Sequence, residues 1–222
     1  MMIPFQQCVL GPVIKCLLVL INIGHQVNGI TPSMVKEEMS KNEIYPHIIG
    51  NIPHYPIKVE YTNGPVNFGT NFTEKEVFEV PSKVYWPVEK KMKRAKKLFS
   101  LLLYGPDVPT RENPIEKYQW VHWVVMNIPG NKWKSGQTVV EYRAWQPFYT
   151  NDIHRCIFLV FPQNARKPII YNETLVLVDS ADDLRGYFNK DIFSKKWNLG
   201  DPYAINFFQM YLNGSEDGNI WR

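Results

Sequence analysis

Two histidines, His122 and His154, are the residues best suited to chemistry in this chain, and each lies where an apolar stretch begins. A neutral imidazole donates one hydrogen bond and accepts another, and a protonated imidazole is a cation. Two converging imidazoles with loop amides around them would therefore form a pocket for phosphate or carboxylate. The alternative is that each histidine is half-buried and makes its hydrogen bonds to neighbouring residues of the protein. The histidines by themselves leave both interpretations open.

The strands expected around these histidines determine whether the two rings meet. Three stretches are apolar on both faces, as strands buried in a layered sheet are: residues 98–104, 121–128 and 157–161. Side chains alternate along a strand. One face of the second strand is therefore predicted to carry Trp120, His122, Val124 and Met126, and the other to carry Val121, Trp123 and Val125.

The third strand, extended back to His154, is predicted to carry His154, Cys156 and Phe158 on one face and Arg155 on the other. If the second and third strands are neighbours, His122 and His154 converge at one end of the sheet. Titratable side chains at the ends of buried strands are a common place for a binding site.

Asp107 and Arg111 lie four residues apart in the proline-rich loop that follows the first of these strands. We expect them to brace the loop through an ion pair or backbone hydrogen bonds, with direct contact to a ligand as the alternative. Pro109 lies where a tight turn is required, and the peptide bond before it is predicted to be cis. Trp120 and Trp123 are expected to belong to the core.

Other kinds of site find no support in the sequence. A zinc site needs further ligands at short spacing, such as His-x-x-x-His or a cysteine pair, and the chain has neither. It also has no Gly-x-Ser-x-Gly elbow for a Ser-His-Asp triad and no phosphate-cradling glycine loop. A hydrolase that used Asp107 and His122 as acid and base would lack a nucleophile and a metal set. We therefore predict a protein that is not an enzyme and holds no metal or cofactor.

The composition indicates one globular, β-rich domain over residues 30–222. Hydrophobic residues make up 45% of the 222-residue chain, which is enough for a core and argues against disorder. Further strands are predicted over residues 57–61, 84–86, 138–142 and 204–212, with helices near residues 31–39 and 73–76 and over 181–197. The predicted architecture is an antiparallel β domain with a few short peripheral helices.

The most basic segment runs from Glu89 to Lys97. Its charge suits an arm for an anionic lipid, a glycosaminoglycan or a nucleic acid. No aromatic residue interrupts the run to stack on bases. We expect an exposed hairpin loop whose charges stay solvated, in keeping with a mild net charge of +4.

The first 29 residues are predicted to be a secretory signal peptide. Lys15 precedes a short apolar run, and Val27 and Gly29 supply small residues at the spacing that signal peptidase accepts. A membrane span needs roughly 20 apolar residues, and Lys15 interrupts the one candidate stretch. The leader therefore predicts secretion and no membrane span.

Three Asn-x-Ser/Thr sequons, at Asn71, Asn172 and Asn213, agree with a secreted glycoprotein. Of the three cysteines, Cys8 and Cys16 lie in the predicted leader. The processed chain would keep Cys156 alone, which excludes an internal disulfide.

The run Pro106-Asp107-Val108-Pro109-Thr110-Arg111 resembles the Asp-Pro-Asp-x-Pro-Ser-Arg motif of phosphatidylethanolamine-binding proteins. Trp120-Val-His122-Trp, Asn127-Ile-Pro-Gly130 and His154-Arg155 follow in the family's order and approximate spacing, and the resemblance extends from about residue 44 to residue 212. Secreted insect members look most similar, given the leader and Arg111-Glu-Asn-Pro114. The resemblance implies a β-sandwich of a large antiparallel sheet on a smaller one, with a small anion pocket at one end.

Carried over by position, the resemblance implies a ligand-binding pocket that includes Asp107, Pro109, Trp120, His122, Pro147, His154 and Phe208. Two positions differ from the family, because Gly105 stands in place of its first aspartate and Phe208 in place of a tyrosine. The missing aspartate would have oriented the histidines, but its charge would also have repelled an anion. The pocket is therefore expected to be more apolar, with an altered affinity for phosphate.

The function implied is that of a secreted binding protein for a small anionic or lipid-like ligand, similar to a phospholipid headgroup, with no nucleic-acid partner. The alternative is an interaction protein that inhibits a protease or a signalling partner through the loops around the pocket. The family includes the Raf kinase inhibitor protein, florigen-type plant regulators and a yeast carboxypeptidase inhibitor. A secretory leader argues against a cytosolic kinase partner.

Overall fold

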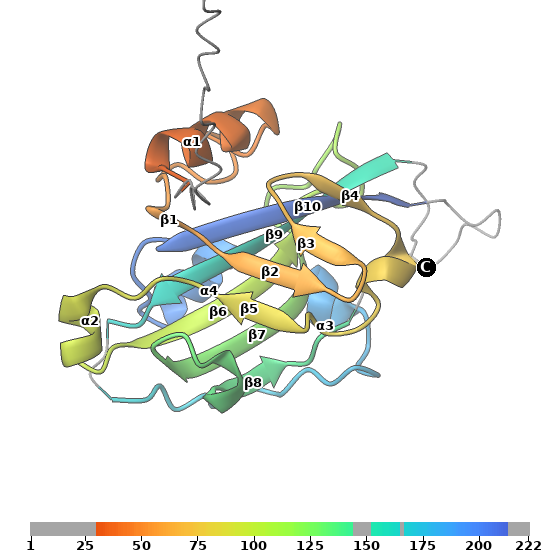
Figure 1. Cartoon of the computed structure of the whole chain (residues 1–222). Coiled ribbons are helices and arrows are strands. Elements are labelled where there is room, and N and C mark those ends of the chain that lie inside the picture. The colour runs from red at the N-terminus through yellow and green to blue at the C-terminus, as the bar shows by residue number, and fades with distance from the viewer. Residues whose placement is uncertain (1–29, 144–151, 165–166, 213–222) are drawn as a thin grey trace, which may run out of the picture.

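The computed structural model describes residues 30–143, 152–164 and 167–212, which form two facing β-sheets with short helices around them (Figure 1). The larger sheet has the order β1-β10-β9-β6-β7-β8, and β4 also pairs with β10. Its strands are β1 (Tyr55–Pro56), β4 (Thr70–Phe72), β6 (Leu98–Gly105), β7 (Trp120–Pro129), β8 (Gln137–Val140), β9 (Asp152–Pro162) and β10 (Ala204–Leu212). The smaller sheet has the order β3-β2-β5, with β2 (Lys58–Tyr61), β3 (Gly64–Val66) and β5 (Lys83–Tyr85). The predicted mainly β architecture, a large sheet with a smaller one, is confirmed.

The larger sheet is mixed, whereas the sequence predicted an antiparallel one. Its central strands β10, β9, β6, β7 and β8 pair antiparallel, but β1 and β4 both run parallel to β10. The chain leaves the edge of β10 after β1, makes the β2–β3 hairpin in the smaller sheet, and returns to the same edge in the same direction as β4. The parallel pairs thus follow from an excursion of the chain between the two sheets.

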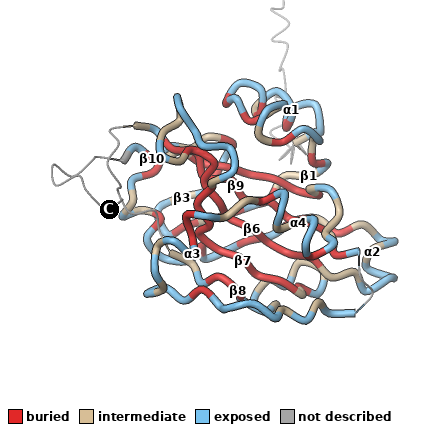
Figure 2. Tube along the Cα trace, turned by 180° about the vertical axis from the view of Figure 1, so that it is seen from behind, coloured by how far each residue is buried: buried red, intermediate tan, exposed pale blue. Residues whose placement is uncertain are grey.

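Two layers of apolar side chains hold the domain together, one on each face of the larger sheet. The layer between the sheets contains Val59, Trp86, Phe99, Trp120, Trp123, Cys156, Phe158 and Phe208 among others. The layer on the outer face contains Val35, Met39, Leu102, Tyr104, Val121, Ile157 and Phe207 among others. β6, β7 and β9 are buried on both faces and are apolar along most of their length, and Figure 2 shows them as the buried centre of the molecule.

The alternation predicted for β7 is wrong beyond His122, because the strand contains a β-bulge. Leu103 of β6 is opposite Trp123, whereas Tyr104 is opposite Val121, so His122 is the extra residue of the bulge. As a result Trp120 and Trp123 both face the layer between the sheets. A bulge turns side chains away from the regular alternation and is frequent beside functional sites.

The helical segments of the described residues are α1 (Pro32–Lys41), the 3₁₀ helices η1 (Glu74–Val77) and η2 (Trp133–Ser135), α2 (Lys90–Arg94), α3 (Asp183–Gly186) and α4 (Lys190–Lys196). The predicted helix starts are present, since Thr31 accepts a hydrogen bond from Met34 N and Thr73 forms a capping box with Glu76. None of the helices in these ranges has the length and apolar character needed to cross a membrane.

Two predictions for helical regions are corrected. The helix predicted over residues 181–197 is divided into α3 and α4, because Phe188 pairs with Gln119 as an isolated bridge and Asn189 caps a new helix through bonds from Asp191 N and Ile192 N. The basic run at residues 89–97 is not a loop throughout, because residues 90–94 form the short helix α2 and Lys93 N donates to Glu89 O.

Candidate functional site

His122 and His154 gather at one end of the larger sheet, although their strands are not neighbours. β6 lies between β7 and β9 and ends at Gly105, opposite Trp120. His122 Nε2 lies 4.0 Å from the Sγ atom of Cys156, which shares a face of β9 with His154 two residues earlier. Both histidines are buried. The side chains of His122 and Cys156 therefore approach each other over the last residues of β6, where Tyr104 and Gly105 still pair with Val121 and Trp120 of β7.

The ring of His122 is fixed by Arg143. Its Nδ1 lies 3.0 Å from Arg143 O, and Arg143 N donates to His122 O over 3.1 Å. A carbonyl oxygen only accepts, so Nδ1 carries the hydrogen and Nε2 of the neutral ring is the acceptor that faces the thiol. Burial lowers the pKa of His122 to about 3, aided by the charges of Arg185, Arg143 and His154 and opposed by the bond to Arg143 O. His122 is thus neutral at ordinary pH.

His154 connects β9 with the proline-rich loop. Burial lowers the pKa of His154, while the charges of Asp107 and Asp152 and a hydrogen bond to the backbone of Asp107 oppose this shift. The loop after β6 is therefore in direct contact with the second histidine.

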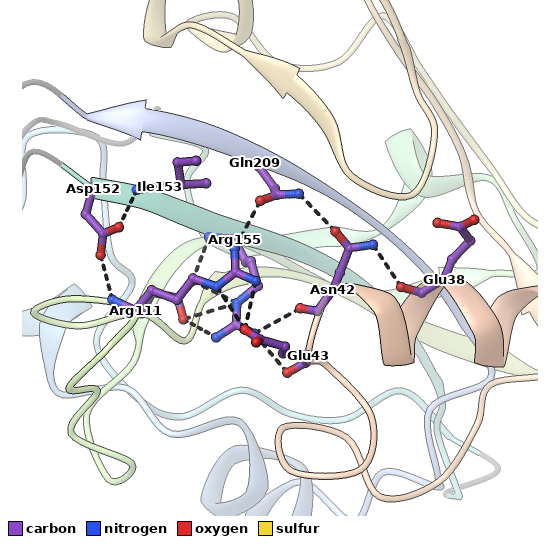
Figure 3. A network of polar contacts seen from close by, with 9 residues as sticks. Glu38, Asn42, Glu43, Arg111, Asp152, Ile153, Arg155 and Gln209 are labelled. Carbon is purple, nitrogen blue, oxygen red and sulfur yellow. Dashed lines mark hydrogen bonds and ion pairs between the residues drawn. The ribbon is translucent and has the colours of Figure 1, made fainter.

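Asp107 is fully buried and pairs with Arg155, not with Arg111. Arg155 Nε donates to Asp107 Oδ2 over 3.0 Å, and the backbone N of Arg155 donates to the same oxygen over 2.7 Å. The Nη1 atom of Arg155 donates to the carbonyls of Asn42 and Glu43, which follow α1 (Figure 3). The carboxylate of Asp107 is therefore engaged within the protein, and the expected Asp107–Arg111 ion pair is absent among the described residues.

Arg111 reaches three other parts of the chain. Its side chain pairs with Glu43 at 2.9 Å and donates to Gln209 Oε1 over 3.2 Å, and its backbone N donates to Asp152 Oδ2 over 2.9 Å (Figure 3). These contacts tie the loop to the segment after α1 and to β9 and β10, and a role as loop brace stays a prediction. Pro109 is exposed, and the peptide bond between Val108 and Pro109 is cis, as predicted.

The remaining predicted residues fall into the core or outside the described ranges. Trp120 is buried, and the guanidinium of Arg143 lies over its ring with the centroid 5.4 Å away. Phe208 is opposite Cys156 in the sheet and packs edge-on against Tyr61 and Phe72. Pro147 and the sequon at Asn213 lie outside the described residues, as do residues 1–29. The sequons at Asn71 and Asn172 are exposed.

Sequence reasoning missed two arginines beside His122. Arg185 is buried and donates to the carbonyls of Val121, His122, Glu141 and Leu177. Burial, together with the charge of Arg143, lowers the pKa of Arg185 to about 10. Arg143 forms an ion pair with Asp182. No strand or helix periodicity marks these arginines, because both are positioned by contacts between distant segments.

A separate cavity of about 480 Å³ lies next to the Asp107–Arg155 pair. Its lining includes Asp107, Arg155 and Lys190, and neither histidine belongs to it. Its charges are largely paired, since Lys190 contacts Asp191. Within the described residues, no group of three or more His, Cys, Asp or Glu side chains is arranged to hold a metal ion.

The family model described as phosphatidylethanolamine-binding protein matches residues 77–204. A putative odorant-binding protein A5 of Drosophila melanogaster is 29% identical over 178 residues, which are 79% of each chain. A 26 kDa secreted antigen of Toxocara canis is 32% identical over 169 residues, 75% of this chain and 60% of the antigen.

Two solved structures share the fold. A carboxypeptidase Y inhibitor, complexed with its cognate proteinase, matches with a TM-score of 0.66 at 19% identity, over 82% of this chain and 96% of the inhibitor. The solution structure of CG7054 matches with a TM-score of 0.54 at 28% identity, over 78% of this chain and 92% of that chain. With the family model covering more than half of the chain and the two-sheet fold in place, this protein belongs to the phosphatidylethanolamine-binding protein family.

Proposed function

We propose that this protein is a secreted, non-enzymatic binding protein that holds a small anionic or amphipathic ligand at a pocket centred on His122 and His154. The observation that carries the proposal is the gathering of two buried imidazoles where β6 ends, with His122 fixed by the backbone of Arg143. Polar groups that converge in an otherwise apolar surrounding are typical of ligand sites.

The charges around His122 support an anionic ligand. Burial is the main cause of the lowered pKa of His122, and the positive charges of Arg185 and Arg143 lower it further, so the ring lies in a positive potential. The same potential attracts an anion. A bound anion would in turn favour the imidazolium form, and its binding would be coupled to the uptake of a proton.

The surroundings of the histidines support a ligand with an apolar part. Phe208 lies beside Cys156 and stacks at a tilt on Phe158. Trp120 lies on the same side of the sheet. Gly105 places no carboxylate at the end of β6 to repel an anion. An amphipathic molecule with an acidic headgroup would satisfy both the positive potential and the apolar surroundings.

Secretion and glycosylation belong to the same proposal. The exposed sequons at Asn71 and Asn172 are accessible to glycan attachment. The Toxocara canis relative is described as a secreted antigen. Analysis of secreted protein by mass spectrometry would give the N-terminus after cleavage and the mass added at Asn71, Asn172 and Asn213.

An inhibitor that acts through the loops around the pocket is the second candidate. It is motivated by the similar structure of the carboxypeptidase Y inhibitor, which was solved with its proteinase. In this chain the loop between β6 and β7 is anchored by Asp107 and Arg111, which gives a partner protein a rigid surface. Proteinase inhibition by the purified protein would support this candidate.

Replacement of His122 by glutamine separates the two candidates. Glutamine keeps a donor for Arg143 O but cannot become a cation. We expect the H122Q variant to lose most of its affinity for phosphoethanolamine in calorimetry, while an inhibitory protein surface would keep its effect. Unchanged affinity in a folded H122Q variant would contradict the proposed pocket.

A further inference from the structure

We propose that the basic end of the molecule, formed by α2 and the turn after β7, is a second binding site, for a compact anion that carries several phosphate groups. The site is a cavity of about 380 Å³ between these two segments. Four lysines line it: Lys93, Lys96, Lys97 and Lys132. The other residues of its lining are apolar, glycine or asparagine, and none of the described lining residues is acidic.

Backbone contacts hold the two segments together. α2 ends at Arg94, the left-handed φ of +49° at Lys96 then turns the chain, and Lys97 N donates to Met92 O over 3.0 Å. Gly130 N donates to Lys97 O over 3.2 Å, and Asn131 Nδ2 donates to Trp86 O over 2.9 Å. The fold therefore holds the two lysine-bearing segments side by side before a ligand binds. This lowers the conformational-entropy cost of binding.

The ammonium groups at this cavity form no ion pair with a carboxylate of the described residues. Among the described residues near the cavity, Lys91 forms an ion pair with Glu89. None of the four lysines that line the cavity forms an ion pair with a described residue. Clustered like charges repel one another, and a bound anion removes this repulsion. The cavity beside Asp107 differs, because its Arg155 and Lys190 each have a carboxylate partner.

Stabilisation of the C-terminal end of α2 is a simpler explanation for some of the basic residues. Cations favour that end of a helix, and Lys91, Lys93 and Arg94 lie in its last turn. The explanation does not extend to Lys132, which comes from another segment, or to Lys96 and Lys97, which follow the helix. The convergence of the two segments on one cavity needs a separate reason.

A ligand with several phosphates matches this arrangement best. Lysine binds phosphate as a point charge, so one phosphate group uses only part of a four-lysine site. Two sources share the required chemistry: a soluble polyphosphate and the headgroup of a polyphosphorylated lipid. Leu98 begins β6 at this end and Gly105 ends it near the histidines, so the two sites lie on the order of 25 Å apart at ~3.3 Å per residue. The second site therefore does not depend on the proposed function of the first.

The test uses inorganic tripolyphosphate as the probe, with calorimetry on the whole protein at about 0.15 M salt, where the Debye length is about 8 Å. The cavity variant replaces all four lysines with glutamine: K93Q, K96Q, K97Q and K132Q. Its control replaces four exposed lysines elsewhere: K41Q, K58Q, K75Q and K167Q. Both variants reduce the formal net charge of +4 to zero.

We expect the cavity variant to lose at least about tenfold in affinity, whereas the control keeps the affinity of the wild type within about twofold, because only the cavity variant removes the converging charges. Equal losses in both variants would show a general charge effect and overturn the proposal, as would no loss in either. The single change K132E, far in sequence from α2, must also weaken binding, which keeps the test decisive if the fourfold variant fails to fold.

Vesicles that contain a polyphosphorylated phosphoinositide distinguish the two sources. The ligand is a lipid headgroup if the wild type binds the vesicles, the cavity variant does not bind them, and tripolyphosphate competes with the binding. Binding of tripolyphosphate without vesicle binding identifies a soluble ligand. In either case the imidazole signals of His122 and His154 are expected not to move, because the lysine cavity lies at the other end of β6.

Discussion

The Nε2 atom of His122 on β7 lies 4.0 Å from the Sγ atom of Cys156 on β9, over the last residues of β6, which runs between these two strands. His122 reaches this position because it is the extra residue of a β-bulge in β7. Its neutral ring presents an acceptor to the thiol, and its other nitrogen is bonded to Arg143 O. Burial thus keeps the central side chain of the proposed pocket neutral, and the bond to Arg143 O fixes its orientation.

Acid is expected to destabilise the protein through His122. The pKa of His122 falls from 6.5 in the unfolded chain to about 3 in the folded one, so the unfolded state binds the proton more tightly. The stabilisation is complete above about pH 6.5 and is lost as the pH falls towards 3, with a slope of up to about 1.4 kcal/mol per pH unit. Urea unfolding of the wild type and the H122Q variant at several pH values measures this slope.

Only the difference between the two proteins tests this prediction, because carboxylates add a pH dependence of their own. The lowered pKa of His154 adds a slope of the same sign that both proteins retain. If wild type and H122Q lose stability in parallel between pH 6.5 and 4, His122 is not held neutral by the fold.

Cys156 is expected to be unreactive in the folded protein. The thiol is buried, and burial raises its pKa, so both the access and the thiolate that alkylation needs are lacking. Iodoacetamide should leave the Cys156 peptide unmodified in native protein and modify it in urea, as followed by peptide mass spectrometry. Rapid native alkylation at Cys156 would show that the end of the sheet opens to solvent.

The Asp107–Arg155 pair is expected to be the most important ion pair for stability in the described chain. Its side chains are 0% and 5% exposed, so the D107A variant leaves a buried guanidinium without its carboxylate. Loss of one partner of a buried pair costs about 3–5 kcal/mol. Denaturant unfolding of the variant measures the loss.

The E43A variant is the matched control, since it removes the carboxylate that pairs with Arg111. Glu43 is 70% exposed in that pair, and solvent screens exposed ion pairs so that they contribute little to stability. A similar loss of stability in D107A and E43A would mean that burial does not govern the strength of these ion pairs.

Burial on both faces explains why the central strands could be predicted from the sequence. β6, β7 and β9 are apolar along most of their length, and the amino-acid pattern carries this information directly. The bulge at His122 could not be predicted, because it arises from the pairing of β7 with β6 and not from the sequence of β7 alone. The alternation was therefore correct up to His122 and wrong after it.

The ion pairs show the same limit. Asp107 and Arg111 are close in sequence, but the partner of Asp107 comes from β9, 48 residues away. The two helices α3 and α4 were merged because apolar residues continue through Phe188, which packs on Phe193. Asn189 was the available signal for a new helix start, since asparagine is a preferred cap.

The central claim, an anion pocket at His122 and His154, is tested most directly by NMR of the imidazole groups during titration with phosphoethanolamine and acetate. We predict that the signals of His122 and His154 move with saturation and that the pKa of His122 rises from about 3, because a bound anion stabilises the imidazolium. The exposed His54 serves as an internal control and is expected to stay fixed. Unmoved His122 and His154 signals at saturating ligand, or equal shifts at His54, would contradict the account.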